Sequence, residues 1–222
     1  MEQAKPSPRS AIKLKVCGMT QADNMLELAA MQPKYMGLIF YEKSSRFFHA
    51  QIPQLPDGLK KVGVFVDSEV SYIMEKVDQY DLNVIQLHGK ESPDYCVELK
   101  AKLSEGIEII KVFSVKEQFD FSLLSAYEDV CDYFLFDTKG KLPGGNGEHF
   151  DWSLLEQYPS RKPFFLSGGI GIDSITQLKE FLKRPIAQFC HAIDVNSRFE
   201  LEPGLKKIDK LKEFKKMFEN EN

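Results

Sequence analysis

A single carboxylate, Asp137, stands where an apolar run of the chain meets a glycine-rich loop. The run spans residues 133–136, and the loop after it holds four glycines between positions 140 and 147. Ionised carboxylates are costly to bury without a partner, so an aspartate directly after a buried strand is expected to face a pocket at the strand's carboxyl end. Neighbouring glycines let the backbone approach a ligand closely. The pattern predicts that Asp137 belongs to a functional site.

Cys17 ends the apolar run 14–16 in the same way and is followed by Gly18. A cysteine in such a run is most often a small buried hydrophobe. At the carboxyl end of a barrel strand, where active sites lie, a thiolate can instead act as a base, because its reference pKa of about 8.5 needs only modest lowering. The cysteines at positions 96, 131 and 190 lack this placement, and we assign them to packing.

Arg46 and His88 follow two further apolar runs. Arg46 ends the polar loop after the run 35–40 and is either a solvated loop residue or a guanidinium placed to bind a carboxylate through paired hydrogen bonds. His88 follows the run 84–87 and precedes Gly89, which predicts a supporting role in the pocket. No second histidine or cysteine stands at metal-ligand spacing from it, so we expect no metal site.

A third group of residues lies in two loops near the end of the chain. Ser167, Gly168 and Gly169 follow the run 164–166, and a polar segment begins at Asp194. In parallel barrels, the last two loops and a short helix often bind phosphate through backbone N–H groups and the helix dipole. A glycine pair alone also fits a simple tight turn, but its pairing with the second polar segment favours a phosphate site.

The elements that position these residues are short apolar runs that alternate with amphipathic segments. The expected strands are residues 14–16, 35–40, 62–66, 84–87, 107–113, 133–136, 164–166 and 187–193. Clear helical patterns occupy residues 21–30, 68–80, 92–103 and 172–181, and each run is followed by a stretch that could be helical. Strict strand–helix alternation predicts an α/β fold with a parallel sheet, and eight units predict a (β/α)8 TIM barrel. We expect a single barrel domain over 12–222 after a flexible leader over 1–11.

Composition excludes several classes of partner. The 222 residues are 43% hydrophobic and 28% charged, and no apolar stretch is long enough to span a membrane. Lys and Arg total 29 against 33 acidic residues, a net charge of −4, and the basic residues are scattered, so nucleic acid is not an expected partner. The basic tail reads as the solvated side of a packed last helix. Widely spaced cysteines and no secretory segment indicate a cytoplasmic protein.

Seven motifs, in order from about residue 12 nearly to the end, resemble those of the phosphoribosylanthranilate isomerase family of tryptophan biosynthesis. They are KVCGMT, GLIFYEKSSRFF, VGVFVD, VIQLHGKE, DYFLFDTKGKLPGGNGEHFDW, FFLSGGIG and DVNSRFELEPGLKKIDKLKEF. The resemblance implies a (β/α)8 isomerase that converts the aminoaldose N-(5'-phosphoribosyl)anthranilate into the aminoketose 1-(2-carboxyphenylamino)-1-deoxyribulose 5-phosphate. It also implies a phosphosugar ligand, no cofactor, and a monomer or homodimer.

The resemblance assigns roles to the residues already singled out. Cys17 is implied as general base, Asp137 as general acid, Arg46 as the holder of the anthranilate carboxylate and His88 as part of the pocket wall. The residues implied to frame the phosphate are Gly168, Gly169, Asp194 and Asn196.

Some positions depart from the family pattern. Ser45 replaces the usual proline before Arg46, Glu148 and His149 replace the usual Lys-Thr, and Arg198 stands where a small residue is usual. These changes concern the loop of Arg46 and the anion site, where Arg198 either crowds the phosphate or adds charge to it.

Three rival functions remain open from the sequence. A histidine-pathway sugar isomerase normally pairs two aspartates where this chain has Cys17 and Asp137. Indole-glycerol-phosphate synthase relies on lysine and glutamate at strand ends, which the motifs do not indicate. A ligand-binding barrel without activity is the non-enzymatic alternative, and the retention of both Cys17 and Asp137 argues against it.

Overall fold

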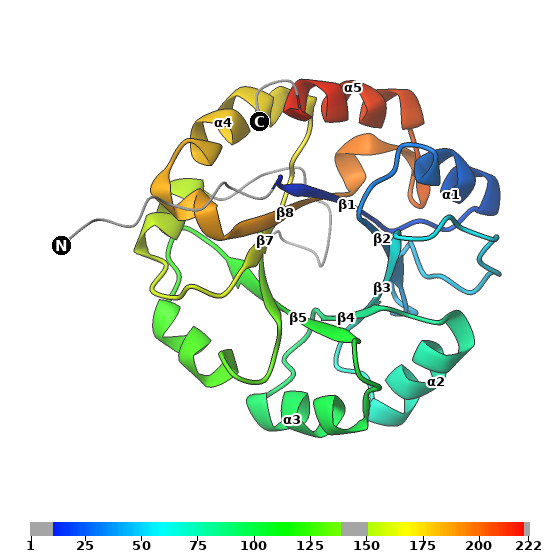
Figure 1. Ribbon diagram of the computed structural model, residues 1–222, viewed down its shortest axis with the longest axis horizontal. Helices are drawn as coiled ribbons and strands as arrows, with labels where there is room; N and C mark the ends of the chain where they lie inside the picture. The colour runs from blue at the N-terminus through cyan, green and yellow to red at the C-terminus, as the bar shows by residue number, and fades with distance from the viewer. Residues whose placement is uncertain (1–10, 139–150, 220–222) are drawn as a thin grey trace.

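Eight parallel strands form a closed barrel in the computed structural model, which describes residues 11–138 and 151–219 (Figure 1). Each strand pairs with the next one along the chain, and the eighth pairs with the first. The predicted TIM barrel is therefore confirmed. The strands are β1 Lys13–Cys17, β2 Tyr35–Ile39, β3 Lys60–Phe65, β4 Val84–Leu87, β5 Glu108–Val115, β6 Tyr133–Thr138, β7 Phe164–Leu166 and β8 Cys190–Val195.

The α-helices lie around the outside of the ring of strands (Figure 1). Their sequences repeat apolar residues at helical spacing, and these residues face the barrel. Local interactions also cap helix ends. At the start of α3, which spans Pro93–Lys102, Ser92 accepts a hydrogen bond from Tyr95 N at 3.2 Å, and Pro93 occupies the first turn. The helices are α1 Ala22–Ala29, α2 Val70–Tyr80, α3 Pro93–Lys102, α4 Ile175–Leu182 and α5 Ile208–Glu219.

Not every strand is followed by an α-helix, so this part of the prediction was wrong. Residues 40–59 between β2 and β3 form no helix, and Pro53 and Pro56 remove backbone donors there. Short 3₁₀ helices follow β5 and β6. The 3₁₀ helices are η1 Phe121–Tyr127, η2 Trp152–Gln157, η3 Ile172–Ser174, η4 Pro185–Phe189 and η5 Ser197–Phe199.

The end of the chain differs from the prediction in two further places. Residues 187–189, expected to begin the eighth strand, lie in η4 because Pro185 starts a helical turn, so β8 begins at Cys190. Two short strands, β9 Glu200–Glu202 and β10 Leu205–Lys206, form a hairpin before α5. Leu205 therefore belongs to this hairpin and not to the last helix, which begins at Ile208.

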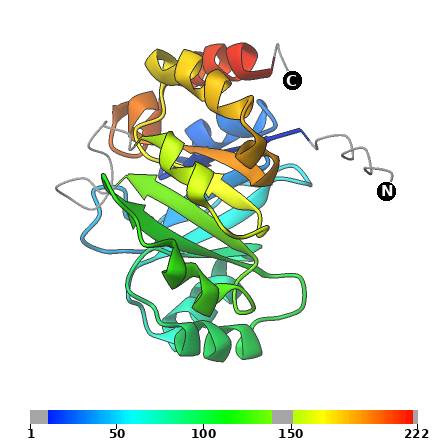
Figure 2. The same ribbon diagram turned by 90° about the vertical axis from the view of Figure 1, so that its left-hand side faces the viewer.

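Two apolar layers hold the barrel together. Side chains alternate along each strand, so a small inner cluster, including Val62, Ile110, Leu135 and Phe165, fills the middle of the barrel. A larger outer cluster packs the strands against the helices, which lie above and below the strands in the side view (Figure 2). Since both faces of the sheet are covered, polar side chains inside the barrel need hydrogen-bond or ion-pair partners. These polar groups lie at the two ends of the barrel.

The described residues form one barrel, and α5 packs against α1 and α4 beside it. Most of the predicted leader over 1–11 lies outside the described residues. In the part of the chain that the structure describes, no helix is long and apolar enough to cross a membrane.

Candidate active site

Cys17 lies at the carboxyl end of β1, inside the barrel. Strand alternation directs Lys13, Lys15 and Cys17 inward, whereas the residues between them join the outer apolar layer. Gly37 of β2 is the register partner of Cys17, and a Cβ at this glycine would stand 2.6 Å from Cys17 Sγ. The absence of a side chain at Gly37 therefore makes room for the thiol.

A buried ion pair lies directly below Cys17. Lys15 Nζ donates to Asp194 Oδ2 at 2.7 Å, and the two side chains are 0% and 6% exposed. Burial opposes the charge on Lys15, but Asp194 and Cys17 together outweigh it and raise the pKa of this lysine. Asp194 Oδ1 has no hydrogen-bond partner among the described residues. The Asp194 side chain is thus paired with Lys15. Any contact of Asp194 with a phosphate would come from its backbone.

The charge state of Cys17 depends on this pair. Burial raises the pKa of the thiol, and the Lys15 ammonium acts against that effect, also by a hydrogen bond to the sulfur. Asp194 raises the pKa again, and Lys206 lowers it. The two lysines are the cations that favour a thiolate in this buried place.

Asp137 and His88 face each other across the same end of the barrel. Asp137 lies near the end of β6, and its Oδ2 is 3.4 Å from His88 Nε2. Gln86 Nε2 approaches His88 Nδ1 at 3.3 Å. Because an amide nitrogen only donates, this contact favours the neutral tautomer with its proton on Nε2, facing Asp137. Asp137 and His88 also interact electrostatically with Asp194 of β8. Their charges therefore influence the Lys15–Asp194 pair below Cys17.

Arg46 is held by a carboxylate that the sequence did not indicate. Its Nε and Nη2 donate to Glu200 at 2.9 and 2.6 Å, and Lys206 Nζ donates to the same carboxylate at 2.6 Å. Burial alone would raise the pKa of Glu200, but these hydrogen bonds lower it. A Cβ at Gly18 would stand 2.8 Å from Arg46 Cδ, so this glycine lets Arg46 lie beside the end of β1. A ligand carboxylate would have to share the guanidinium with Glu200.

The two predicted phosphate loops lie next to each other. Gly168 and Gly169 have φ angles of +94° and +65°, and a Cβ at Gly168 would collide with Thr138 at the end of β6. The loop after β8 approaches them, because a Cβ at Gly171 would stand 3.2 Å from Arg198 Cβ. Asn196 Oδ1 accepts from Lys206 Nζ at 2.6 Å.

One expectation about these loops changes. Pro203 and Gly204 do not start the short helix expected at the phosphate site, because Gly204, at φ +93°, belongs to the hairpin of β9 and β10. The short helix after β8 is η5, directly after Asn196. Arg198 makes an ion pair with Asp173 at 3.4 Å. Glu148 and His149 lie outside the described residues.

Sequence reasoning singled out Cys17, Arg46, His88 and Asp137, and the structure places all four at one end of the barrel. It missed the buried lysines and glutamates beside them, which the motifs did not indicate. These residues are Lys15, Glu91, Lys111, Glu200 and Lys206. The inward alternation of β1 was the available signal for Lys15, since Lys13, Lys15 and Cys17 stand at every second position.

Comparison with known proteins decides the family. Residues 14–217 match the family model described as N-(5'phosphoribosyl)anthranilate (PRA) isomerase. The chain belongs to the phosphoribosylanthranilate isomerase family. It is 44% identical over 208 residues to the N-(5'-phosphoribosyl)anthranilate isomerase of Parabacteroides distasonis, covering 90% of each chain. It is 39% identical over 193 residues to that of Phocaeicola vulgatus, covering 87% of this chain and 91% of the relative.

Solved structures of the family share the barrel. Phosphoribosylanthranilate isomerase from Thermotoga maritima superposes with a TM-score of 0.77 at 28% identity, covering 94% of this chain and 98% of that one. A family structure in complex with reduced 1-(o-carboxyphenylamino)-1-deoxyribulose 5-phosphate superposes with a TM-score of 0.74 at 27% identity and the same coverage. Within the described residues, no group of three or more His, Cys, Asp or Glu side chains is arranged to hold a metal ion.

Proposed function

We propose that this chain converts N-(5'-phosphoribosyl)anthranilate into 1-(2-carboxyphenylamino)-1-deoxyribulose 5-phosphate, with Cys17 and Asp137 as the reacting side chains. Membership of the isomerase family supports the reaction, which belongs to tryptophan biosynthesis. One observation carries the residue roles: a thiol over a buried lysine and a carboxyl group facing a histidine lie at the same end of the barrel. An aldose–ketose isomerase needs a base and an acid of this kind.

Asp137 acts first, as the general acid. It gives its proton to the ring oxygen of the ribose while the anthranilate nitrogen lone pair forms a C=N bond and the bond from C1 to that oxygen breaks. The product is an open-chain protonated Schiff base. Asp137 is then a carboxylate, and the N–H of His88, 3.4 Å away in this structure, stabilises the new charge.

Cys17 acts second, as the general base. Its thiolate takes the proton from C2 of the Schiff base, and the electron pair moves through C1 to the nitrogen, giving an enolamine. The enolamine tautomerises to the aminoketose. The nitrogen is the electron sink, so the step needs no added oxidant or reductant. Lys15 favours the thiolate, because it acts against the burial that raises the pKa of Cys17.

The remaining predicted residues hold the two ends of the substrate. Arg46 binds the anthranilate carboxylate and is oriented for it by Glu200. Gly168 and Gly169, with the backbone at Asp194 and Asn196, hold the phosphate, and η5 adds backbone N–H groups. Arg198 stands beside this site, next to Gly171.

We also propose that the enzyme works in the cytoplasm as a monomer or homodimer and does not bind nucleic acid. The net charge of −4 and the scattering of the basic residues outside the last helix support the last point. One structure of the Thermotoga maritima relative is described as a monomeric form of a dimeric enzyme.

The test of this function is a continuous fluorescence assay of freshly made N-(5'-phosphoribosyl)anthranilate. The intact protein is expected to consume it, and Asp137→Asn is expected to lose about 10²- to 10⁴-fold in kcat with its circular dichroism unchanged. An intact, folded protein that leaves the substrate untouched would instead support the binding-only barrel. Near-parental kcat in Asp137→Asn would remove Asp137 from the chemistry.

A further inference from the structure

We propose that Glu91 and Lys111 are positioning residues that hold His88 against Asp137. The proposal rests on the proposed function, because His88 matters only if Asp137 takes part in the reaction. Neither Glu91 nor Lys111 points into the barrel: Lys111 lies on β5 between Ile110 and Val112, which belong to the inner cluster, so its side chain points outward. Their effect on the reaction must therefore pass through the backbone that carries His88.

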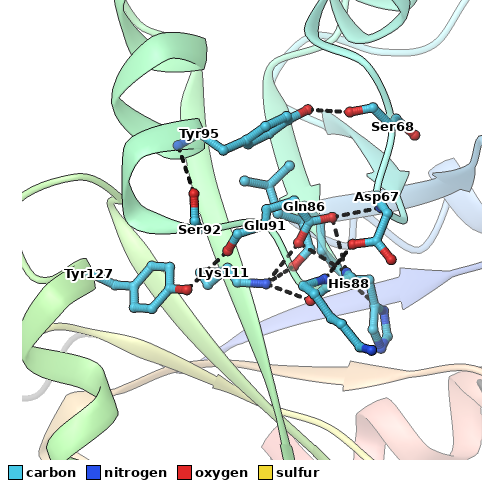
Figure 3. Close-up of polar contacts among 12 residues, drawn as sticks. Asp67, Ser68, Gln86, His88, Glu91, Ser92, Tyr95, Lys111 and Tyr127 are labelled. Carbon is cyan, nitrogen blue, oxygen red and sulfur yellow. Dashed lines mark hydrogen bonds and ion pairs between the residues drawn. The ribbon is translucent and has the colours of Figure 1, made fainter.

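Glu91 and Lys111 form an ion pair next to the carboxyl end of β4 (Figure 3). Lys111 Nζ lies 2.8 Å from Glu91 Oε2, and the side chains are 4% and 1% exposed. A pair so thoroughly buried gains little stability over apolar residues of similar size, since desolvation cancels most of the attraction. The hydrogen bonds that the pair makes to the backbone are its distinguishing feature.

Those hydrogen bonds converge on Gly89, the residue directly after His88. Gly89 N donates to Glu91 Oε2 at 3.0 Å, and Lys111 Nζ donates to Gly89 O at 2.8 Å. Both polar groups of this residue are thus fixed by the buried pair. A Cβ at Gly89 would lie 2.6 Å from Asp67 N, so only glycine fits the space.

The same carboxylate joins two neighbouring loops. Glu91 Oε1 accepts from Asp67 N at 2.9 Å, and Lys90 N donates to Asp67 Oδ1 at 2.5 Å. Asp67 follows β3 with a φ of +48°, a conformation that costs energy for a residue other than glycine and that these bonds maintain. Tyr127 from η1 donates to Glu91 O at 3.0 Å, which ties the loop to the segment after β5 (Figure 3).

His88 is fixed from its other side by β3 and β4. Its backbone N donates to Phe65 O at 2.8 Å, and Gln86 Nε2 approaches its ring at 3.3 Å. With the Gly89 peptide held by Glu91 and Lys111, the imidazole keeps one orientation, in which Nε2 faces Asp137. A shift of the loop by about 1 Å is enough to cost 10²-fold in rate when a reacting group is displaced.

The test is a double-mutant cycle between Glu91 and His88 in the isomerase assay. Glu91→Gln keeps the shape of the side chain but loses its charge and half of its acceptors. It is expected to lower kcat about 10-fold or more with KM changed less than about 3-fold, since the effect is on the acid and not on substrate binding. In a His88→Ala background the same change is expected to cost less than about 2-fold. Equal losses in both backgrounds, or no loss in either, would overturn the proposal.

A matched control separates position from charge. Glu98→Gln removes a glutamate of α3 that pairs with Lys102 at 2.7 Å on the exposed surface, and it is expected to leave kcat and KM unchanged. Should Glu91→Gln fail to fold, Tyr127→Phe takes its place in the cycle: it removes one hydroxyl and is expected to lower kcat about 3-fold, again only when His88 is present. Additive losses for Tyr127→Phe would overturn the proposal as well.

An NMR measurement tests the inference independently of turnover. The His88 ring resonances, assigned by loss of their signal in His88→Ala, are expected to move or broaden in Glu91→Gln and to stay in place in Glu98→Gln. Unmoved His88 resonances would overturn the proposal even in an active enzyme. Moved resonances in a protein without isomerase activity would support the positioning of His88 while the proposed function fails.

Discussion

The two ends of the barrel interior both contain polar side chains, but one holds a histidine that burial keeps neutral and the other a fully buried ion pair. At the carboxyl end, Lys15 and Asp194 form an ion pair at 2.7 Å below Cys17, and Lys15 acts against the burial that raises the pKa of Asp194. At the amino end, the first residues of the strands surround His191, and burial lowers the pKa of its ring to about 4. Tyr35 donates to His191 Nε2 at 2.8 Å, and Lys13 Nζ lies 3.3 Å from the same nitrogen.

The difference follows from what each end must do. Because an ammonium only donates, the contact with Lys13 makes Nε2 of His191 the acceptor, and the low pKa of the ring keeps the imidazole neutral. At the carboxyl end, Asp194 Oδ1 has no hydrogen-bond partner among the described residues, and the thiol above Lys15 is the group whose charge the pair controls. In parallel barrels the amino end serves stability and the carboxyl end serves chemistry. Here the amino end keeps its charged pair, Lys60 and Glu108, partly exposed, whereas the carboxyl end buries Lys15 and Asp194 beneath the thiol.

Removing the charge at the carboxyl end should have the largest effect. Lys15→Met leaves Asp194 buried without a partner and is expected to cost about 3–5 kcal/mol of stability. It also removes the main cation that offsets burial, so the pKa of Cys17 rises further. The thiolate is the active form and becomes more abundant as pH rises, so the rise of kcat/KM with pH should move to higher pH.

The matched control for Lys15→Met lies two residues earlier on the same inward row. Lys13→Met removes an amino-end lysine and should leave the pH at which kcat/KM rises unchanged. Denaturant melts and pH–rate profiles of the two variants measure both effects. Identical pH–rate profiles for Lys15→Met and the intact protein would contradict the role of the pair.

Removing the guanidinium at the rim should have an intermediate effect. A hydrogen bond to a charged group contributes about 1.5–3 kcal/mol, so Arg46→Ala is expected to raise KM about 10- to 100-fold, with kcat changed less. Arg46→Lys should recover only part of the loss, because a point charge cannot reproduce the paired hydrogen bonds. The exposed Arg161, before β7 at the other end, gives the control: Arg161→Ala should change neither constant.

The smallest effect is expected at the amino end, and on stability alone. The folded pKa of His191, about 4, lies below the usual value of 6.5, so the intact protein should lose stability as pH falls from 6.5 towards 4. The loss is at most about 3 kcal/mol and less in practice, because the ring is partly solvated. His191→Gln keeps a partner for Tyr35 and should show a shallower loss in urea melts at pH 7 and pH 4.5. Equal slopes would show that His191 does not titrate in this range.

Much of the fold could be predicted because it rests on local patterns. Apolar runs such as residues 84–87 and 164–166 coincide with β4 and β7, since a strand covered on both faces must be apolar throughout. Residues 187–189 were misread because an apolar run does not distinguish a buried strand from a 3₁₀ turn after Pro185. The hairpin of β9 and β10 was missed because it is short and its residues continue the spacing of α5.

The candidate site was predicted less completely than the fold. Cys17 and Asp137 could be found because each ends an apolar run, which is a signal along the chain. Glu200, which holds Arg46 from 154 residues away, and Glu91, which meets Lys111 across 20 residues, become neighbours only when the barrel closes. Lysines and glutamates are mostly exposed, so the sequence alone gives no reason to place these inside.

One set of rates tests the comparison between the two ends most directly: the initial rate of substrate loss for the intact protein, Cys17→Ala and His191→Gln, measured side by side at neutral pH. Cys17→Ala is expected to lose about 10²- to 10⁴-fold in kcat, the usual cost of removing a general base, while His191→Gln keeps the parental rate. Circular dichroism should show all three folded. A Cys17→Ala variant with near-parental turnover, or a His191→Gln variant that loses activity while folded, would contradict the assignment of chemistry to the carboxyl end.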